Sequence, residues 1–155
     1  MNKQRRSILK GSLALSAAGI AASAGLLSPR SVMAAWNKPA FEATDSASAI
    51  STMFGSDSVA DSADITLKAP DIAENGAVVP VTVTSSIANT ESISLIVNNN
   101  PTPLTASFDV TNAEAYVSTR IKMGKTSEVT AIVKAGGKLY SAKKEVKVTI
   151  GGCGG

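Results

Sequence analysis

The sequence predicts a mainly β protein: an antiparallel β-sandwich, preceded by one short helix and followed by a glycine-rich arm. From Asp64 onward, short runs rich in Val, Ile and Thr alternate with Gly, Pro and Asn, which is the pattern of strands joined by turns. No stretch with a helical period separates these runs. About 120 residues remain once an export signal is removed, enough for one core, so we expect a single domain.

The first expected element is a helix between residues 43 and 54. Thr44 or Asp45 can cap its start, and Gly55 can end it. We expect its apolar stripe to pack on the domain or on a partner protein, because nothing in it suggests a cofactor site. The stripe recurs at the spacings of one helix face and consists of Ala43, Ala47, Ile50 and Phe54, with Met53 beside them.

Seven runs are expected to form strands, and turn signals separate them. Gly136-Gly137 predicts a tight turn and Asn98-Asn99-Asn100-Pro101 a loop. Seven short strands at this spacing are typical of an immunoglobulin-like β-sandwich. The signature of true antibody domains, two cysteines around a tryptophan, is absent, so the prediction holds at class level. The runs are Asp64–Leu67, Val78–Thr84, Ser92–Val97, Thr105–Asp109, Glu114–Lys122, Ser127–Lys134 and Lys138–Thr149.

The first residues predict export. Arg5 and Arg6 precede two apolar residues and a lysine, and a moderately apolar run rich in Ala, Gly and Ser follows from Gly11 to Leu27. This is a twin-arginine signal, too short and too polar for a permanent membrane span. The residues Val32-Met33-Ala34 suit a signal peptidase, and we expect cleavage after Ala34 or Ala35. We therefore expect a signal peptide over 1–34, a soluble periplasmic protein, and no stable membrane insertion.

Removal of the signal reverses the net charge. Five of the fifteen basic residues leave with it and none of the twelve acidic ones, so the mature net charge is −2. The basic isoelectric point of the precursor is therefore no argument for nucleic-acid binding. Residues 35–119 carry two basic and ten acidic residues, whereas 120–155 carry eight basic and two acidic. Lysines such as Lys134, Lys143 and Lys147 are expected to be solvated outer-face or edge-strand residues; the alternative is a positive field around the strands that lead to the arm.

Catalytic and metal-binding constellations are not expected. The sequence has no histidine and one cysteine, so serine and cysteine triads, structural disulfides and the usual zinc ligand sets cannot be assembled. The carboxylate pairs Asp57 with Asp61 and Asp71 with Glu74 lie in polar, loop-like sequence and suit solubility or turns better than acid–base catalysis. The chain is expected to be no enzyme and to need no cofactor.

The single cysteine lies in the final segment, Gly151-Gly152-Cys153-Gly154-Gly155. Glycines on both sides leave the thiol open and the backbone free, and the five residues can span roughly 17 Å when extended. A frayed, functionless end is the simplest alternative. Because no basic residue adjoins Cys153, its pKa should stay near or above about 8.5. Such a thiol suits the carrying of an intermediate better than catalysis.

Three segments of the sequence are specific to a known family: Asp64 to Gly76, Val117 to Gly124, and the closing Gly-Gly-Cys-Gly-Gly. In these segments the sequence resembles SoxY, the sulfur-carrier subunit of the bacterial thiosulfate-oxidising Sox system. The resemblance implies that Cys153 is the site of covalent attachment. It implies that 64–150 is the β-sandwich domain, 35–63 an extension with the helix, and 151–155 the carrier arm.

The resemblance also implies a cycle and its partners. A c-type cytochrome complex couples thiosulfate to the cysteine as an S-thiosulfonate, a manganese-dependent thiosulfohydrolase releases sulfate, and a sulfane dehydrogenase, where present, oxidises the remaining persulfide. A second β-sandwich subunit, SoxZ, forms a heterodimer with the carrier. We expect it to contact an exposed apolar face on a sheet or on the 43–54 helix.

Two other classes of function remain open from the residues alone. An exported structural or adhesion β-domain could join two copies through a disulfide at Cys153. A periplasmic thiol enzyme would need a lowered cysteine pKa and turnover by the isolated chain.

Overall fold

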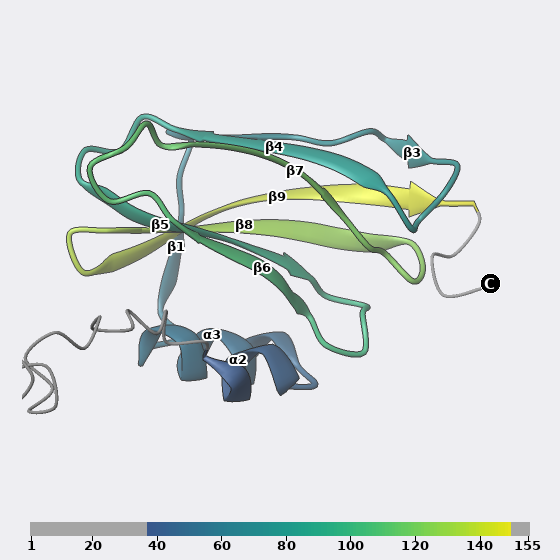
Figure 1. The fold of residues 1–155 in the computed structure, drawn as a ribbon, viewed down its shortest axis with the longest axis horizontal. Coiled ribbons are helices and arrows are strands. Elements are labelled where there is room, and N and C mark those ends of the chain that lie inside the picture. Colours follow the sequence, from purple (N-terminus) through teal and green to yellow (C-terminus); the bar gives the residue numbers. More distant parts are fainter. Residues whose placement is uncertain (1–36, 150–155) are drawn as a thin grey trace, which may run out of the picture. The chain divides into compact units, whose positions relative to one another are not determined.

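The computed structural model of the chain describes residues 37–149, which form two β-sheets and a pair of helices (Figure 1). The helices are α2 (Lys38–Glu42) and α3 (Ser46–Phe54). The strands are β1 (Val59–Asp61), β2 (Ile65–Lys68), β3 (Ile72–Ala73), β4 (Val79–Ser85), β5 (Thr90–Val97), β6 (Leu104–Asp109), β7 (Tyr116–Ile121), β8 (Ser127–Ala135) and β9 (Lys138–Val148).

The two sheets differ in size. The larger sheet has the order β1-β9-β8-β5-β6, with β3 also paired to β9, and the smaller sheet has the order β2-β4-β7. All pairs are antiparallel except those that β1 and β3 make with β9. The predicted sandwich is therefore confirmed, and each of the seven expected runs contains a strand.

The core lies between the sheets and is built from aliphatic side chains. Alternate residues of a strand face opposite sides of a sheet, and the inward residues of both sheets have almost no exposed surface. The inward residues include Val81 and Val83 of β4, Ile93 and Leu95 of β5, and Val129 and Val133 of β8. At about 25 cal/mol for each Å² of apolar surface removed from water, this burial is the main force that holds the sandwich together.

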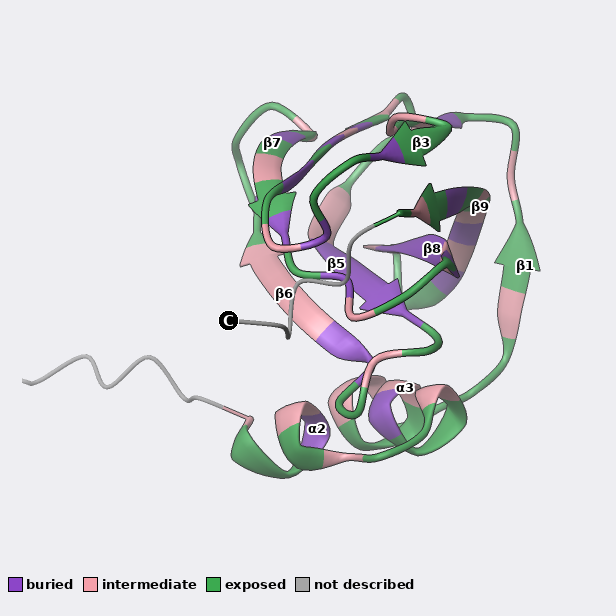
Figure 2. Cartoon of the chain, turned by 90° about the vertical axis from the view of Figure 1, so that its right-hand side faces the viewer, coloured by how far each residue is buried: buried purple, intermediate pink, exposed green. Residues whose placement is uncertain are grey.

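A second buried cluster joins the helices to the outer face of the larger sheet (Figure 2). The helices contribute Ala40 and Ala49, which are fully buried, and the strands contribute Ile96, Ile132 and Leu139. Phe41, Ala43, Ile50, Met53 and Phe54 pack around them. Most of the apolar stripe predicted for the helix is thus used within the domain. The prediction was wrong for Ala47, which is exposed, and it missed Ala49.

Local sequence sets the ends of α3. The Asp45 carboxylate accepts a hydrogen bond from the Ser48 amide at 2.8 Å, which satisfies a backbone donor left free in the first turn. Gly55 ends the helix with a left-handed φ of 74°, a conformation that favours glycine. Both capping predictions are confirmed.

Three elements were not expected from the sequence. Helix α2 is only five residues long, too short to show a helical period, although Asn37 and Pro39 are typical of a helix start. Strands β1 and β3 have three and two residues and lie parallel to β9, so no hairpin signal announces them. Strand β1 belongs to the larger sheet although it precedes residue 64.

Between β8 and β9, Gly136 and Gly137 form the predicted two-residue turn. Both have left-handed φ values, 55° and 73°, and Ala135 is paired with Lys138, as in the type I′ hairpins that glycine favours. From this turn β9 runs to the opposite end of the sandwich, where the described chain ends.

Candidate functional site

The end of β9 is fixed from both sides, and this end carries the last described residues. On one side the Lys147 amide donates to the Asp71 carbonyl at 3.0 Å and the Thr149 amide to the Ala73 carbonyl at 3.1 Å. On the other side the Val148 amide donates to the Thr126 hydroxyl at 2.9 Å. Three consecutive amides therefore have partners up to residue 149. We call this segment, 147–149, the β9 anchor.

The asparagine loop supports the same end. Asn99 donates from its side chain to the Thr126 carbonyl at 2.9 Å, and Asn100 donates to the Lys122 carbonyl at 2.8 Å. Asn100 also accepts from the Gly124 amide at 3.0 Å. These bonds fix the β7–β8 connection beside the β9 anchor. Backbone groups of the connection that have no partner in a strand are satisfied by the amide side chains of Asn99 and Asn100. The sequence indicated a loop here but not this role.

Basic residues surround the anchor. Arg120, Lys122, Lys125 and Lys147 are exposed, and the ion pairs found between residues 37 and 149 include none of them. Lys144 is instead held by Asp71 at 3.0 Å and by the Ala69 carbonyl at 2.6 Å.

The predicted attachment site falls outside the part of the chain that the structure describes. Gly151, Gly152, Cys153, Gly154 and Gly155 lie outside the described residues, as do Arg5, Arg6 and the predicted signal peptide. The described part of the chain places the β9 anchor four residues before Cys153. An extended chain covers about 3.3 to 3.6 Å per residue, so the Cα atom of Cys153 can lie no farther than roughly 14 Å from the Cα atom of Thr149.

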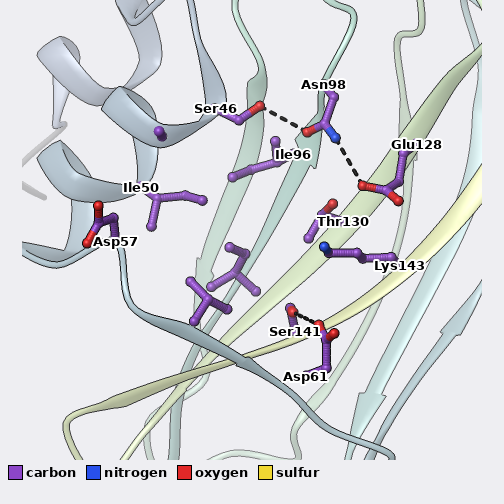
Figure 3. A pocket seen from close by; sticks show the side chains of 13 residues that line it. Ser46, Ile50, Asp57, Asp61, Ile96, Asn98, Glu128, Thr130, Ser141 and Lys143 are labelled. Atoms are coloured by element: carbon purple, nitrogen blue, oxygen red, sulfur yellow. Dashed lines mark hydrogen bonds between the residues drawn. The ribbon is translucent and has the colours of Figure 1, made fainter.

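A cavity of about 420 Å³ lies between α3, β1 and the outer face of the larger sheet (Figure 3). Its floor includes Ile96, Thr130 and Ile132. Asn98 links one wall to the sheet: it accepts from the Ser46 hydroxyl at 2.9 Å and donates to Glu128 at 3.1 Å. The cavity is therefore part of the junction between helices and sheet.

One residue of each carboxylate pair named in the sequence has a partner in the structure. Asp61 accepts from the Ser141 hydroxyl at 2.7 Å, and Asp71 pairs with Lys144 at 3.0 Å. Within the described residues no cluster of His, Cys, Asp or Glu could hold a metal ion. Asp61 and Asp71 thus take part in contacts between distant segments.

The end of the sandwich opposite the β9 anchor is acidic. Asp64, Glu91, Asp109 and Glu114 lie there with Lys134 and Lys138. Lys134 pairs with Glu91 at 2.8 Å. Its hydrogen bond, with a second from the Gly137 amide, holds the pKa of the Glu91 carboxyl below its usual range. The two ends of the sandwich therefore differ in charge.

Of the two surfaces on which we expect partner contact, a sheet face and the 43–54 helix, the helix is largely covered. Its apolar side packs on the larger sheet, so this side is not available to another protein. The large apolar side chains that are exposed in the described chain are Ile72, Val78 and Tyr116. Two of them, Ile72 and Val78, flank the β3–β4 connection, which lies beside the β9 anchor.

Comparison with known proteins gives the family. Residues 50–153 match the family described as sulfur oxidation protein SoxY. The chain belongs to the SoxY family. The sequence resemblance is thereby confirmed, and the matched region extends to the position of the single cysteine.

A solved structure agrees with this assignment. The chain is 50% identical to the sulfur carrier protein SoxY from Chlorobium limicola f. thiosulfatophilum, with a TM-score of 0.60, over 66% of this chain and 94% of that one. No curated protein matches the sequence. Neither helix between residues 37 and 149 has the length and apolar content needed to cross a membrane.

Proposed function

We propose that this protein is a periplasmic sulfur carrier that holds thiosulfate-derived intermediates covalently on Cys153. One observation carries the proposal: the match to the SoxY family runs through residue 153, where the only cysteine of the sequence stands. The name of the Chlorobium protein, a sulfur carrier, supports it. The β9 anchor contributes a fixed starting point for the last six residues.

The proposed cycle needs a cysteine thiolate that can form a bond to sulfur and a chain long enough to bring it into the active sites of several enzymes. The Cys153 thiolate forms a bond to the sulfane sulfur of thiosulfate, and the electron pair released passes to a c-type cytochrome complex. Hydrolysis by a manganese thiosulfohydrolase then adds water, breaks the bond to the sulfonate group, releases sulfate and leaves a persulfide on the cysteine. A sulfane dehydrogenase, where present, oxidises that outer sulfur with oxygen atoms from water and passes the electrons to its own acceptor. A second hydrolysis restores the thiol.

The carrier supplies no catalytic group in this scheme. The sequence has no histidine, and the described residues hold no metal-binding cluster. Each step therefore depends on a partner enzyme, and the carrier contributes attachment, reach and docking. Glycines on both sides of Cys153 suit entry into narrow active sites because they add no side chain.

The proposal includes export and a partner subunit. Arg5 and Arg6 open a twin-arginine signal, and this route moves folded proteins, so a SoxZ-like β-sandwich without its own signal could cross as a heterodimer with this chain. Exposed Ile72, Val78 and Tyr116 are the apolar residues available for such a contact. A mature chain that is fully monomeric and well behaved alone and does not bind a SoxZ-like subunit contradicts this part.

Replacement of the thiol in cells tests the carrier function. Cells that produce Cys153→Ser as their only copy should stop oxidising thiosulfate, and export of the variant should be unchanged. Met123→Leu is a matched control because it leaves the cysteine in place and conserves core volume. If the serine variant supports normal thiosulfate consumption, the protein is not a carrier. The same conclusion follows if the unaltered protein remains active while its Cys153 is held in a disulfide-linked dimer.

A further inference from the structure

We propose that the basic residues around the β9 anchor form a docking surface for partner proteins that have clustered carboxylates at the entrance to their active sites. The surface consists of Arg120, Lys122, Lys125 and Lys147, and we call it the basic end. The inference rests on the proposed carrier function and adds the chemistry of the surface that its partners present.

The first argument is that strand protection does not explain these residues. Lysine on an edge strand prevents pairing with other chains. Strand β9, however, lies between β8 on one side and β1 and β3 on the other, so Lys147 is not on an edge. Lys122 and Lys125 belong to the β7–β8 connection, where no strand needs protection. Only Arg120, on edge strand β7, fits that explanation.

The second argument is that charge is separated along the strands. The basic end has four exposed cations, and nearby Lys144 is neutralised by Asp71. Glu74 is the acidic residue of the adjoining β3–β4 connection. The opposite end carries four carboxylates and two lysines, of which Lys134 is paired with Glu91. Strand β9 alone spans about 33 Å between these ends at 3.3 Å per residue. The two ends therefore differ in charge, although Glu74, Glu128 and Glu145 offset part of the positive charge at the basic end.

The third argument is the position of the arm. The β9 anchor lies within the basic end, because Lys147 belongs to both. The Val148 amide of the anchor also donates a hydrogen bond to the hydroxyl of Thr126, in the β7–β8 connection, at 2.9 Å. A field of this direction turns the arm toward an acidic surface during encounter, which raises association rates by about 10- to 1000-fold in steered complexes. Glu128 and Glu145, paired on the outer face of the larger sheet, lie on the face that also carries Lys147, because side chains two residues apart on a strand share a face.

A protein surface fits better than a small anion. The cations come from β7, from the β7–β8 connection and from β9, and their side chains do not line the cavity of Figure 3. Cations spread over the end of a domain act through their summed field, whereas a bound anion needs donors that converge on one point.

The first experiment measures the field at the thiol and needs no partner. Cys153 of the mature protein is reacted with the dianionic disulfide 5,5′-dithiobis(2-nitrobenzoate) and with the neutral disulfide 2,2′-dithiodipyridine; in each, the thiolate forms a mixed disulfide and a thiolate leaves. The measured quantity is the rate with the dianionic reagent divided by the rate with the neutral reagent. At 10 mM salt this ratio should be about tenfold lower in the double variant Lys122→Glu/Lys125→Glu than in the unaltered protein. At 0.5 M salt the difference should disappear, because screening removes the field. The matched control, Lys38→Glu/Lys138→Glu, changes the net charge equally but away from the anchor and should leave the ratio nearly unchanged. Equal effects of the two double variants overturn the proposal.

The second experiment measures docking. The thiosulfonate form of each variant is given to a purified thiosulfohydrolase, and kcat/KM is recorded against salt concentration. The basic-end variant should lose about tenfold at low salt with kcat unchanged, and the control should not. Turnover that is the same for all variants at every salt concentration overturns the docking surface and leaves the carrier function intact. If the thiosulfonate form of the carrier without substitutions is not turned over at any salt concentration, both the docking surface and the carrier function are overturned.

Discussion

Truncation of Ile96 and of Ile93 to alanine should separate the two buried clusters energetically. Both residues lie on β5 and are almost completely buried, with 1% and 0% of their surface exposed. They face opposite sides of the larger sheet: Ile93 packs in the closed core between the sheets, and Ile96 packs beneath the helices. Ile96 also lines the cavity beside α3, which opens to solvent.

The expected magnitudes follow from this difference. Each substitution removes three carbons, worth about 2.4 kcal/mol at about 0.8 kcal/mol per buried methylene. At Ile93 an enclosed hole of about 70 Å³ adds about 1.7 kcal/mol at about 24 cal/mol per Å³, so the total is about 4 kcal/mol. At Ile96 the new space joins an existing open cavity, so the loss should stay near about 2.5 kcal/mol.

Urea unfolding of both variants at one pH measures the difference. The midpoint should shift more for Ile93→Ala than for Ile96→Ala, and the slope of the transition should be the same in both, which shows that the folded and unfolded states are unchanged in compactness. An equal loss, or a larger one at Ile96, refutes the division of the domain into a closed core and an open helix–sheet junction.

Three further predictions concern local structure. Gly137→Ala should destabilise the β8–β9 turn by about 1 kcal/mol because φ is 73° there; a chemical-denaturation midpoint equal to that of the unaltered chain contradicts this. Asp45→Ala should lower the thermal midpoint and Asp45→Asn should not, since asparagine also caps. The hydrogen bond from the Ser48 amide lowers the pKa of the Asp45 carboxyl below its ordinary value of 3.8. The stability that the charged carboxylate contributes is therefore complete above pH 3.8 and is lost as the pH falls through the lowered pKa. In Asp45→Asn this loss should be missing when stability is measured at acid pH. Thr126→Val should speed hydrogen exchange of the Val148 amide about fivefold, as the loss of about 1 kcal/mol predicts, and unchanged exchange would show that the anchor does not depend on this bond.

Much of the sandwich could be predicted because its long strands carry their own signals. The period of two along β8 and β9, the Gly136-Gly137 turn and the apolar spacing of α3 are all local patterns, and each reappears in the structure. Strands β1 and β3 could not be found in this way. They exist because β9 offers backbone partners to them, so the information lies in the tertiary contact and not in their own residues.

The candidate site divides along the same line. The single cysteine and its glycines were evident from composition and spacing, and the structure does not describe them. The β9 anchor was not predicted, because it depends on bonds between distant segments such as Thr126 with Val148. The basic end was suggested by the excess of Lys and Arg after residue 120, and the favoured interpretation was solvated outer-face or edge-strand lysines. The topology places β9 inside the sheet, which leaves the outer-face alternative for Lys147.

The most direct test of the carrier function is the intact mass of the mature protein purified under non-reducing conditions from cells that are oxidising thiosulfate. The carrier function predicts a thiosulfonate or persulfide adduct, located on the peptide that contains Cys153, removed by reducing agent and absent from cells without thiosulfate. An unmodified thiol throughout, in cells that consume thiosulfate at their normal rate, contradicts it.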